Sequence, residues 1–243
     1  MENEVVRGIV LGNITYKDKD KILSVFTLEK GIISCKLIGV LKENAKLKAV
    51  KEPFCFAEFV LNSKQKENTI FTVTSASIID SFFDITKNYN KFLIGCNLLE
   101  IIKRVLEKEC PNEPLFVETL KALKTLAYSE CDENVVLIKY MVSIFEAMGY
   151  ALSLDKCACC GDRFINKRFF NFEEGEIVCF SCKRPNAALV SPLLHSTLRL
   201  AKNTEYDNLK NLKLKPDGIN EALELLVLNF KNKFEYSLNV LSL

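Results

Sequence analysis

Two short stretches decide the fold of this chain: Cys157-Ala-Cys-Cys160-Gly161 and Cys179-Phe-Ser-Cys182. Each contains a Cys-x2-Cys hook, whose tight turn points two thiolates at one centre. Two hooks brought together make a tetrahedral all-thiolate site that suits a single Zn2+ ion. The predicted ligands are Cys157, Cys160, Cys179 and Cys182. Because four protein ligands leave no position open for water or substrate, we expect the metal to be structural rather than catalytic.

The remaining cysteines do not extend this pattern. Cys159 lies inside the first hook and could substitute as a ligand, but the turn favours the two outer cysteines. Cys35, Cys55 and Cys96 lie among apolar residues, which predicts that they are buried as small hydrophobic side chains. A disulfide-stapled secreted protein is not expected, because the chain is long and shows no export signal. We therefore expect a reducing, cytoplasmic compartment.

The composition is that of an ordinary soluble globular protein. Of the 243 residues, 49% are hydrophobic and 26% are charged, and the formal net charge is +2. The best candidate for a membrane span, Val135 to Met148, is too short and is interrupted by Lys139 and Glu146. The sequence therefore predicts no membrane segment, and net charge alone does not identify a nucleic-acid-binding protein.

Residues 1–80 show the alternation and turn punctuation of β-strands. The expected strands cover residues 5–12, 22–28, 32–40, 54–61 and 69–79. The polar residues 62–68 predict a hairpin loop between the last two strands. Five strands in this length are typical of a small closed barrel such as an OB-fold.

Lysines gather in two parts of this predicted barrel. The first group, opposed only by Glu43, consists of Lys36, Lys42, Lys46, Lys48 and Lys51. Most of it falls in a connection between strands, where a barrel often carries its ligand contacts. The second group consists of Lys17, Lys19 and Lys21. On charge alone, a solvated loop explains the first group as well as a phosphate-binding surface does. The second group alternates with Asp18 and Asp20, a pattern that usually marks a solvated turn or edge.

From about residue 88 the hydrophobic period becomes helical. The expected helices cover residues 88–106, 115–128, 133–148, 192–201 and 217–240, each to within a few residues. Ser191 is the expected N-cap of the fourth helix, with Pro192 at its first position. The chain is thus predicted to be a multidomain α+β protein: an N-terminal OB-fold β-barrel in residues 1–80, then an α-helical domain in residues 81–243. The four-cysteine zinc knuckle is expected as an insertion at about 154–185.

The sequence offers no recognisable catalytic site. His195 is the only histidine, and its position in the first turn of a helix predicts a partly exposed side chain. Neither the phosphate-binding loop of ATPases nor the glycine motif of dinucleotide-binding proteins is present. We therefore predict that the protein is not an enzyme and has no small-molecule substrate.

The segment between the cysteine hooks predicts a small ribbon. Glu173-Glu-Gly-Glu176 looks like a hairpin tip, and the metal is expected to pin the ribbon onto the helical domain. A nucleic-acid contact by the ribbon is the less favoured interpretation. Its basic residues are Arg163, Lys167, Arg168, Lys183 and Arg184.

A five-stranded barrel, a helical domain and an inserted four-cysteine knuckle together resemble the bacterial RecO family of recombination mediators. The Tyr16-Lys-Asp-Lys-Asp turn and residues 23–31, Leu-Ser-Val-Phe-Thr-Leu-Glu-Lys-Gly, are similar to family segments of the barrel. Residues 154–161 resemble the opening of the family's zinc knuckle. The family usually has a basic pair directly after the glycine of its third strand, where this chain has Val40-Leu41.

The resemblance implies a function that composition does not show. RecO-like proteins bind single- and double-stranded DNA without sequence preference and anneal complementary strands. With RecR, and often RecF, they load RecA onto DNA covered by single-strand-binding protein, SSB. For this chain the resemblance implies those partners, and a cytoplasmic protein that joins the nucleoid during repair. Two alternatives stay open: an RNA-binding or ribosome-associated protein with an OB-fold and a zinc ribbon, and an adaptor that binds no DNA.

Overall fold

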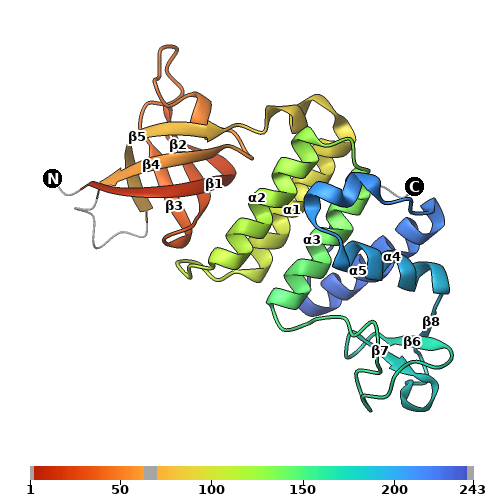
Figure 1. The fold of residues 1–243 in the computed structure, drawn as a ribbon. Helices are drawn as coiled ribbons and strands as arrows, with labels where there is room; N and C mark the ends of the chain where they lie inside the picture. Colours follow the sequence, from red (N-terminus) through yellow and green to blue (C-terminus); the bar gives the residue numbers. More distant parts are fainter. Residues whose placement is uncertain (1–2, 63–69, 240–243) are drawn as a thin grey trace. The chain divides into compact units, whose positions relative to one another are not determined.

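The computed structural model describes residues 3–62 and 70–239, so the predicted hairpin loop at 62–68 lies, from residue 63 on, outside the described residues (Figure 1). The chain forms two compact units, residues 1–123 and residues 124–243. The limit between the units falls within a helix rather than at residue 80. Whether residues 1–80 form a domain by themselves stays a prediction.

Five strands close into the predicted OB-like barrel. The strands are β1 (Asn3–Tyr16), β2 (Asp20–Thr27), β3 (Gly31–Leu37), β4 (Phe56–Asn62) and β5 (Ile70–Asp80). Their order is β1-β2-β3-β5-β4, and β4 pairs with β1 to complete the circle. All neighbouring strands are antiparallel except β3 and β5. This is the strand order expected of an OB-fold.

Side chains that alternate along the strands fill the barrel. In β3, the residues Ile33, Cys35 and Leu37 are at most 3% exposed, and they share one hydrophobic cluster with Phe59 and Leu61 of β4. The intervening side chains are more exposed, as the two-residue period of a strand requires. The interior is therefore a packed core, and ligands can reach only the outer face and the ends of the barrel.

Two helices complete the first unit. They are α1 (Tyr89–Val105) and the beginning of α2 (Glu113–Tyr128). Phe116 of α2 meets the ring of Phe26 of β2 edge-on, with centroids 5.2 Å apart. Such aromatic pairs add to the free energy gained by burying their surface. This packing explains why the first unit extends well beyond the barrel strands.

The connection between β3 and β4, residues 38–55, carries most of the first lysine group, as predicted. Val40 and Val50 are buried in the barrel cluster, and the short 3-10 turn η1 (Ala49–Lys51) leads back towards β4. The exposed side chains of the connection include Lys42, Lys46 and Lys48. Buried apolar residues thus anchor this loop, while its charges face solvent.

The second unit is a helical domain with an inserted ribbon. Its long helices are α3 (Glu133–Ala147), α4 (Pro192–Asn203) and α5 (Pro216–Phe234). Lys139 of α3 is only 8% exposed, and its Nζ donates to the carbonyl of Lys202 near the end of α4 at 2.9 Å. A cation at this position satisfies a helix carbonyl that has no partner within the helix. Among the described residues, no helix combines the length and apolarity that a membrane span requires.

The ribbon has three short strands. They are β6 (Arg168–Asn171), β7 (Glu176–Cys179) and β8 (Ala188–Val190), in the order β7-β6-β8. Gly175 forms the predicted hairpin tip with a φ of +71°, and a Cβ there would lie 2.5 Å from the Asn229 side chain of α5. The Nζ of Lys233, also on α5, donates to the carbonyl of Glu174 at 2.7 Å. The tip of the ribbon is therefore fastened to a helix of its own unit.

Three predicted element ends were wrong. The first strand, predicted to end at residue 12, runs on to Tyr16. The last helix ends at Phe234 rather than near Val240, which lies outside the described residues, because Glu235 adopts a left-handed conformation with a φ of 52°. The third strand ends at Leu37, because the chain turns at Gly39 with a φ of +66°. In the last two places a single backbone conformation overrides a hydrophobic pattern that continues.

Gly31→Ala tests how tightly the start of β3 is packed. Gly31 has a φ of +69°, and an added Cβ would lie 2.3 Å from the backbone carbonyl oxygen of Cys110. Gly39 is a matched control, since its φ is +66° but its nearest neighbour would be a flexible Lys42 carbon at 3.4 Å. We expect Gly39→Ala to lower the free energy of unfolding by about 1 kcal/mol, and Gly31→Ala by about 2–3 kcal/mol more. Urea unfolding measures both, and equal losses would contradict the close packing.

Candidate metal centre and nucleic-acid interface

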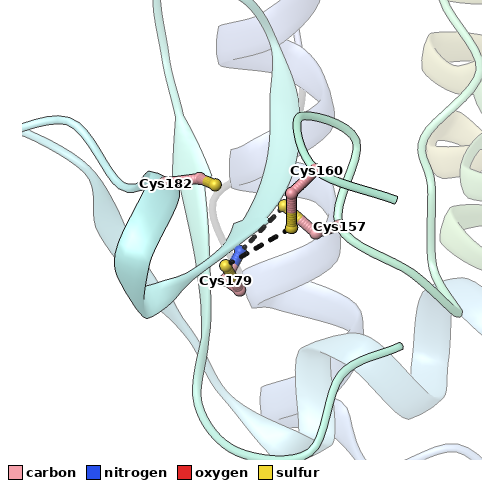
Figure 2. Close-up of side chains that lie close together, drawn as sticks. All are labelled: Cys157, Cys160, Cys179 and Cys182. Atoms are coloured by element: carbon pink, nitrogen blue, oxygen red, sulfur yellow. Dashed lines mark hydrogen bonds between the residues drawn. The ribbon is translucent and has the colours of Figure 1, made fainter. Parts of the chain in front are cut away.

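The four predicted cysteine ligands come together in the second unit (Figure 2). Their sulfur atoms all lie within 4.8 Å of one another, and those of Cys160 and Cys179 are 3.9 Å apart. In a tetrahedral site, metal–sulfur bonds of about 2.3 Å place the sulfur atoms about 3.8 Å apart. The donor set and its spacing therefore fit one tetrahedral metal ion.

Backbone hydrogen bonds hold the two hooks face to face. The first hook lies in the loop after α3, and the second spans the end of β7 and the turn η3 (Phe180–Cys182). Gly161 closes the first hook with a φ of +79°, and its N–H donates to the carbonyl of Cys157 at 2.9 Å. The N–H of Ala158 donates to the carbonyl of Ile177 in β7 at 3.1 Å, which ties the first hook to the ribbon.

The thiols of the cluster differ in acidity. Burial by itself raises the pKa of Cys157, but backbone N–H groups, those of Cys160 and Cys179 foremost, outweigh it and lower the pKa to about 6. For Cys160, the backbone N–H of Asp162 lowers the pKa. The hydrogen bond between the Cys160 and Cys157 thiols, together with burial, outweighs this and raises the pKa of Cys160 to about 11. One thiolate thus forms readily and the next with difficulty. A bound dication would remove this difference in acidity, because a coordinating thiol is deprotonated outright.

Cys159 stays outside the group of four. Its side chain is exposed, and its sulfur is not among the atoms that converge. Cys159 is nevertheless a neighbour of Cys182. The Cys182 thiol has a raised pKa because it shares hydrogen bonds with Cys179 and, second in size, with Cys159. The geometry therefore favours the predicted ligand set and leaves Cys159 close enough to compete.

In the first unit, lysines from both groups meet at Tyr16, the last residue of β1. The Nζ atoms of Lys17 and Lys36 lie 5.4 Å and 5.0 Å from the centroid of its ring. The Tyr16 side chain is 39% exposed. An accessible ring beside two ammonium groups can stack on a base while the cations face the neighbouring phosphates.

Two further contacts join the lysine groups into one surface. The N–H of Leu41 donates to the carbonyl of Lys19 at 3.1 Å. Asn13 accepts a hydrogen bond from the Lys21 ammonium and donates to the carbonyl of Lys51 at 2.8 Å. We call this surface the basic face, and its lysines are Lys17, Lys19, Lys21, Lys36, Lys42, Lys46, Lys48 and Lys51. Among the described residues, Lys42, Lys46 and Lys48 form no ion pair, so their charges are available to a ligand.

Asp20 fixes the place where the lysine-bearing connection leaves the barrel. Its carboxylate accepts the N–H of Gly39 at 2.8 Å and pairs with Lys36 at 3.2 Å. The hydrogen bond from Gly39, aided by Lys36, lowers the pKa of the Asp20 carboxyl. The carboxylate is therefore ionised at neutral pH, where it positions the loop and offsets the charge of Lys36.

Several predictions about single residues are settled by burial. Cys35 and Cys55 are buried as predicted. Phe54 is buried as well, so its ring is not accessible for base stacking. The expectation for Cys96 was only partly right, since it is half-buried. The expectation for His195 was wrong: it is 8% exposed, with its Nε2 2.6 Å from the carbonyl oxygen of Leu154. The segment before the hooks covers this face of α4, and nothing in the local sequence signals that contact.

Two family profiles match nearly the whole chain. "Recombination protein O N terminal" matches residues 1–82, and "Recombination protein O C terminal" matches residues 86–239. The chain belongs to the recombination protein O family. A DNA repair protein RecO from Caldicellulosiruptor saccharolyticus is 28% identical over 224 residues, which are 92% of this chain and 90% of the relative. Another from Caldicellulosiruptor bescii is 31% identical over 185 residues, 74% and 72% of the two chains.

Membership in the RecO family confirms the resemblance seen in the sequence. A DNA repair protein RecO from Clostridium novyi, 24% identical over 202 residues, covers 83% of this chain and 78% of its own length. The predicted fold class is confirmed as well: an OB-like barrel comes first, and a helical domain with a four-cysteine cluster follows. The protein thus stands among proteins of DNA repair and recombination.

Cys157→Ser should remove the metal, whereas Cys159→Ser should not. Cys157 is 1% exposed within the cluster, while Cys159 is exposed and outside it. We expect the metal content of the purified protein, measured by elemental mass spectrometry, to fall at least about tenfold in the first variant. The second should keep about one ion per chain. Loss of the metal in Cys159→Ser would mean that this thiol replaces one of the four predicted ligands.

Proposed function

We propose that this RecO family protein is a DNA repair and recombination mediator that performs no chemical step. It binds single- and double-stranded DNA, anneals complementary strands and, with RecR, helps to load RecA onto single-stranded DNA covered by SSB, with RecF as a further partner. The observation that carries the proposal is the basic face, where lysines from two chain segments surround the accessible ring of Tyr16 on an OB-like barrel. This work is done in the cytoplasm, at the nucleoid during repair.

Phosphate contacts supply the affinity in this proposal. Lysines that neutralise phosphates release condensed counterions, so binding is independent of sequence and weakens steeply as salt rises. Neutralising the phosphates of one strand also lowers its repulsion of a complementary strand, which favours annealing. Stacking on Tyr16 adds affinity that does not depend on which base is present.

The metal in this proposal is one structural Zn2+ ion. Zinc prefers four thiolates in a tetrahedron, has no redox chemistry and supplies binding energy that stabilises the fold around it. The cysteine hooks would hold it at the base of the ribbon, opposite the tip that is fastened to α5. Its contribution is to fix the ribbon on the helical domain.

Changing Lys42, Lys46 and Lys48 together to Glu should weaken DNA binding and flatten its salt dependence. Each lost phosphate contact lowers the slope of log K against log salt by about 0.7 for a single strand, so the triple variant should lose about 2 units of slope. Fluorescence anisotropy with a labelled oligothymidine at several salt concentrations measures both quantities.

A matched control for this variant changes Lys108, Lys121 and Lys124 to Glu. These lysines are exposed, lie outside the basic face and undergo the same total change of charge. The control should keep most of the affinity and the slope. Equal effects of the two variants would show that only net charge matters, and that the basic face does not contact DNA.

Tyr16→Ala should weaken binding to single-stranded DNA by about 1–3 kcal/mol per stacked base, which is roughly 5- to 150-fold. Tyr16→Phe keeps the ring and should stay within about twofold of the unchanged protein. The side chain is partly exposed, so neither change should unfold the barrel. Anisotropy titrations with oligothymidine make the comparison, and similar losses in the two variants would argue against stacking.

Strand annealing tests the proposed function as a whole. Two complementary oligonucleotides coated with SSB from the same organism are mixed with the purified, metal-loaded protein, and ATP is omitted. Annealing that is fast and declines with salt is the expected result. Tighter binding to structured RNA than to DNA would favour an RNA-binding protein instead. Absence of any nucleic-acid binding at low salt would favour an adaptor.

A further inference from the structure

A second positively charged hollow lies in the other unit, beside the cysteine hooks. Two adjoining cavities of about 330 and 450 Å3 share Leu154, Asp155, Arg163 and Arg199 as lining residues. We call the two together the ribbon cleft. The cations that line it are Lys156, Arg163, Arg168, Arg199 and Lys202. Asp155 is the only acidic residue of the lining.

Most of this charge is not neutralised within the protein. Among the described residues, Lys156, Arg163 and Arg168 take part in no ion pair. Arg199 meets Asp155 at 3.6 Å, and the two side chains are 58% and 77% exposed. A pair so exposed is weak and does not compete strongly with an incoming anion.

Arg168 gives the clearest sign that a ligand belongs in the cleft. Its Nε atom is buried and has no hydrogen-bond partner. The guanidinium group lies 5.2 Å from the centroid of the Phe164 ring, and both side chains line the larger cavity. A buried charged donor without an acceptor is costly, and an anion in the cleft would supply that acceptor.

The shape and chemistry of the ribbon cleft fit a single strand of nucleic acid. The planar fork of arginine matches phosphate oxygens, and three arginines line the larger cavity. The cations follow two joined cavities rather than one point, which suits an extended polyanion more than a single ion. Phe164 adds a flat apolar surface on which a base or sugar can lie.

We propose that the ribbon cleft binds the backbone phosphates of one DNA strand through Arg163, Arg168 and Arg199. The proposal rests on the proposed function and extends it, because it gives the protein a strand-binding surface in each of its two units. The cleft lies next to the first cysteine hook in sequence, so a bound metal also steadies one of its walls.

The test uses the full-length, metal-loaded protein and a single-stranded oligonucleotide that carries 5-iodouracil. Irradiation joins this base to nearby aromatic side chains, and mass spectrometry of the digested protein identifies the peptide. We expect crosslinks in the peptide with Phe164 as well as in the peptide with Tyr16. In Arg163→Glu/Arg199→Glu, the Phe164 crosslink should be lost, and the slope of log K against log salt should fall by about 1.4, for two phosphate contacts.

The matched control is Lys210→Glu/Lys213→Glu, which makes the same change of charge at two exposed lysines of the same unit. It should keep both the crosslink and the slope. Retained metal content in both variants shows that a loss does not come from unfolding of the ribbon.

Three results would overturn the ribbon cleft as a DNA site. One is a crosslink at Tyr16 with none at Phe164, which leaves the proposed function intact. Another is a slope of log K against log salt for DNA that is unchanged in Arg163→Glu/Arg199→Glu, together with loss of binding to a poly-glutamate peptide. That combination would make the cleft a site for acidic protein segments. The third is the absence of any oligonucleotide binding by the unchanged protein, which also overturns the proposed function.

Discussion

The parallel pairing of β3 with β5 closes the barrel and determines how the first unit is connected. Cys35 lies opposite Phe71 in this pair, and β4 lies on the far side of β5. A chain that leaves β3 therefore cannot reach β4 through a tight hairpin and must cross one end of the barrel, through residues 38–55. Because that crossing covers an apolar core, Val40 and Val50 turn inward and the lysines between them are left outside. The outward position of Lys42, Lys46 and Lys48 is thus a consequence of strand order.

In both units, hydrogen bonds to the backbone position the segments that carry the charged side chains. In the barrel, the side chains of Asn13 and Asp20 hold the two ends of the lysine-bearing connection through hydrogen bonds to its backbone. In the second unit, the backbone of the first hook is tied to β7, which places Arg163 beside the helix that carries Arg199. Both arrangements are made by hydrogen bonds within the protein. A surface that is ordered before binding loses less conformational entropy when a flexible strand arrives.

Local patterns allowed the sequence to predict much of this structure. The turn that a Cys-x2-Cys spacing forms points both thiols the same way, so the four converging cysteines were predictable. The N-cap Ser191 was predictable too, and its side chain accepts the Leu194 N–H at the start of α4. Long-range contacts were not predictable. The approach of Lys36 to Tyr16 depends on strand register, and the burial of His195 depends on a segment distant in sequence. The ribbon cleft was predictable only in part for the same reason: Arg163 and Arg168 belong to the predicted ribbon, but Arg199 comes from a distant stretch of the chain.

The fastened tip of the ribbon changes what loss of the metal would do. The hooks are the two ends of a hairpin whose strands are paired from Arg168 to Cys179 and whose tip is held by Lys233. With the hairpin formed, bringing the hooks together closes only residues 161–167 instead of the whole segment 161–178. The difference in loop-closure entropy is on the order of 1 kcal/mol in favour of binding. Exchange of an ion bound there would then need only a local opening at one end of the hairpin, without refolding of the domain.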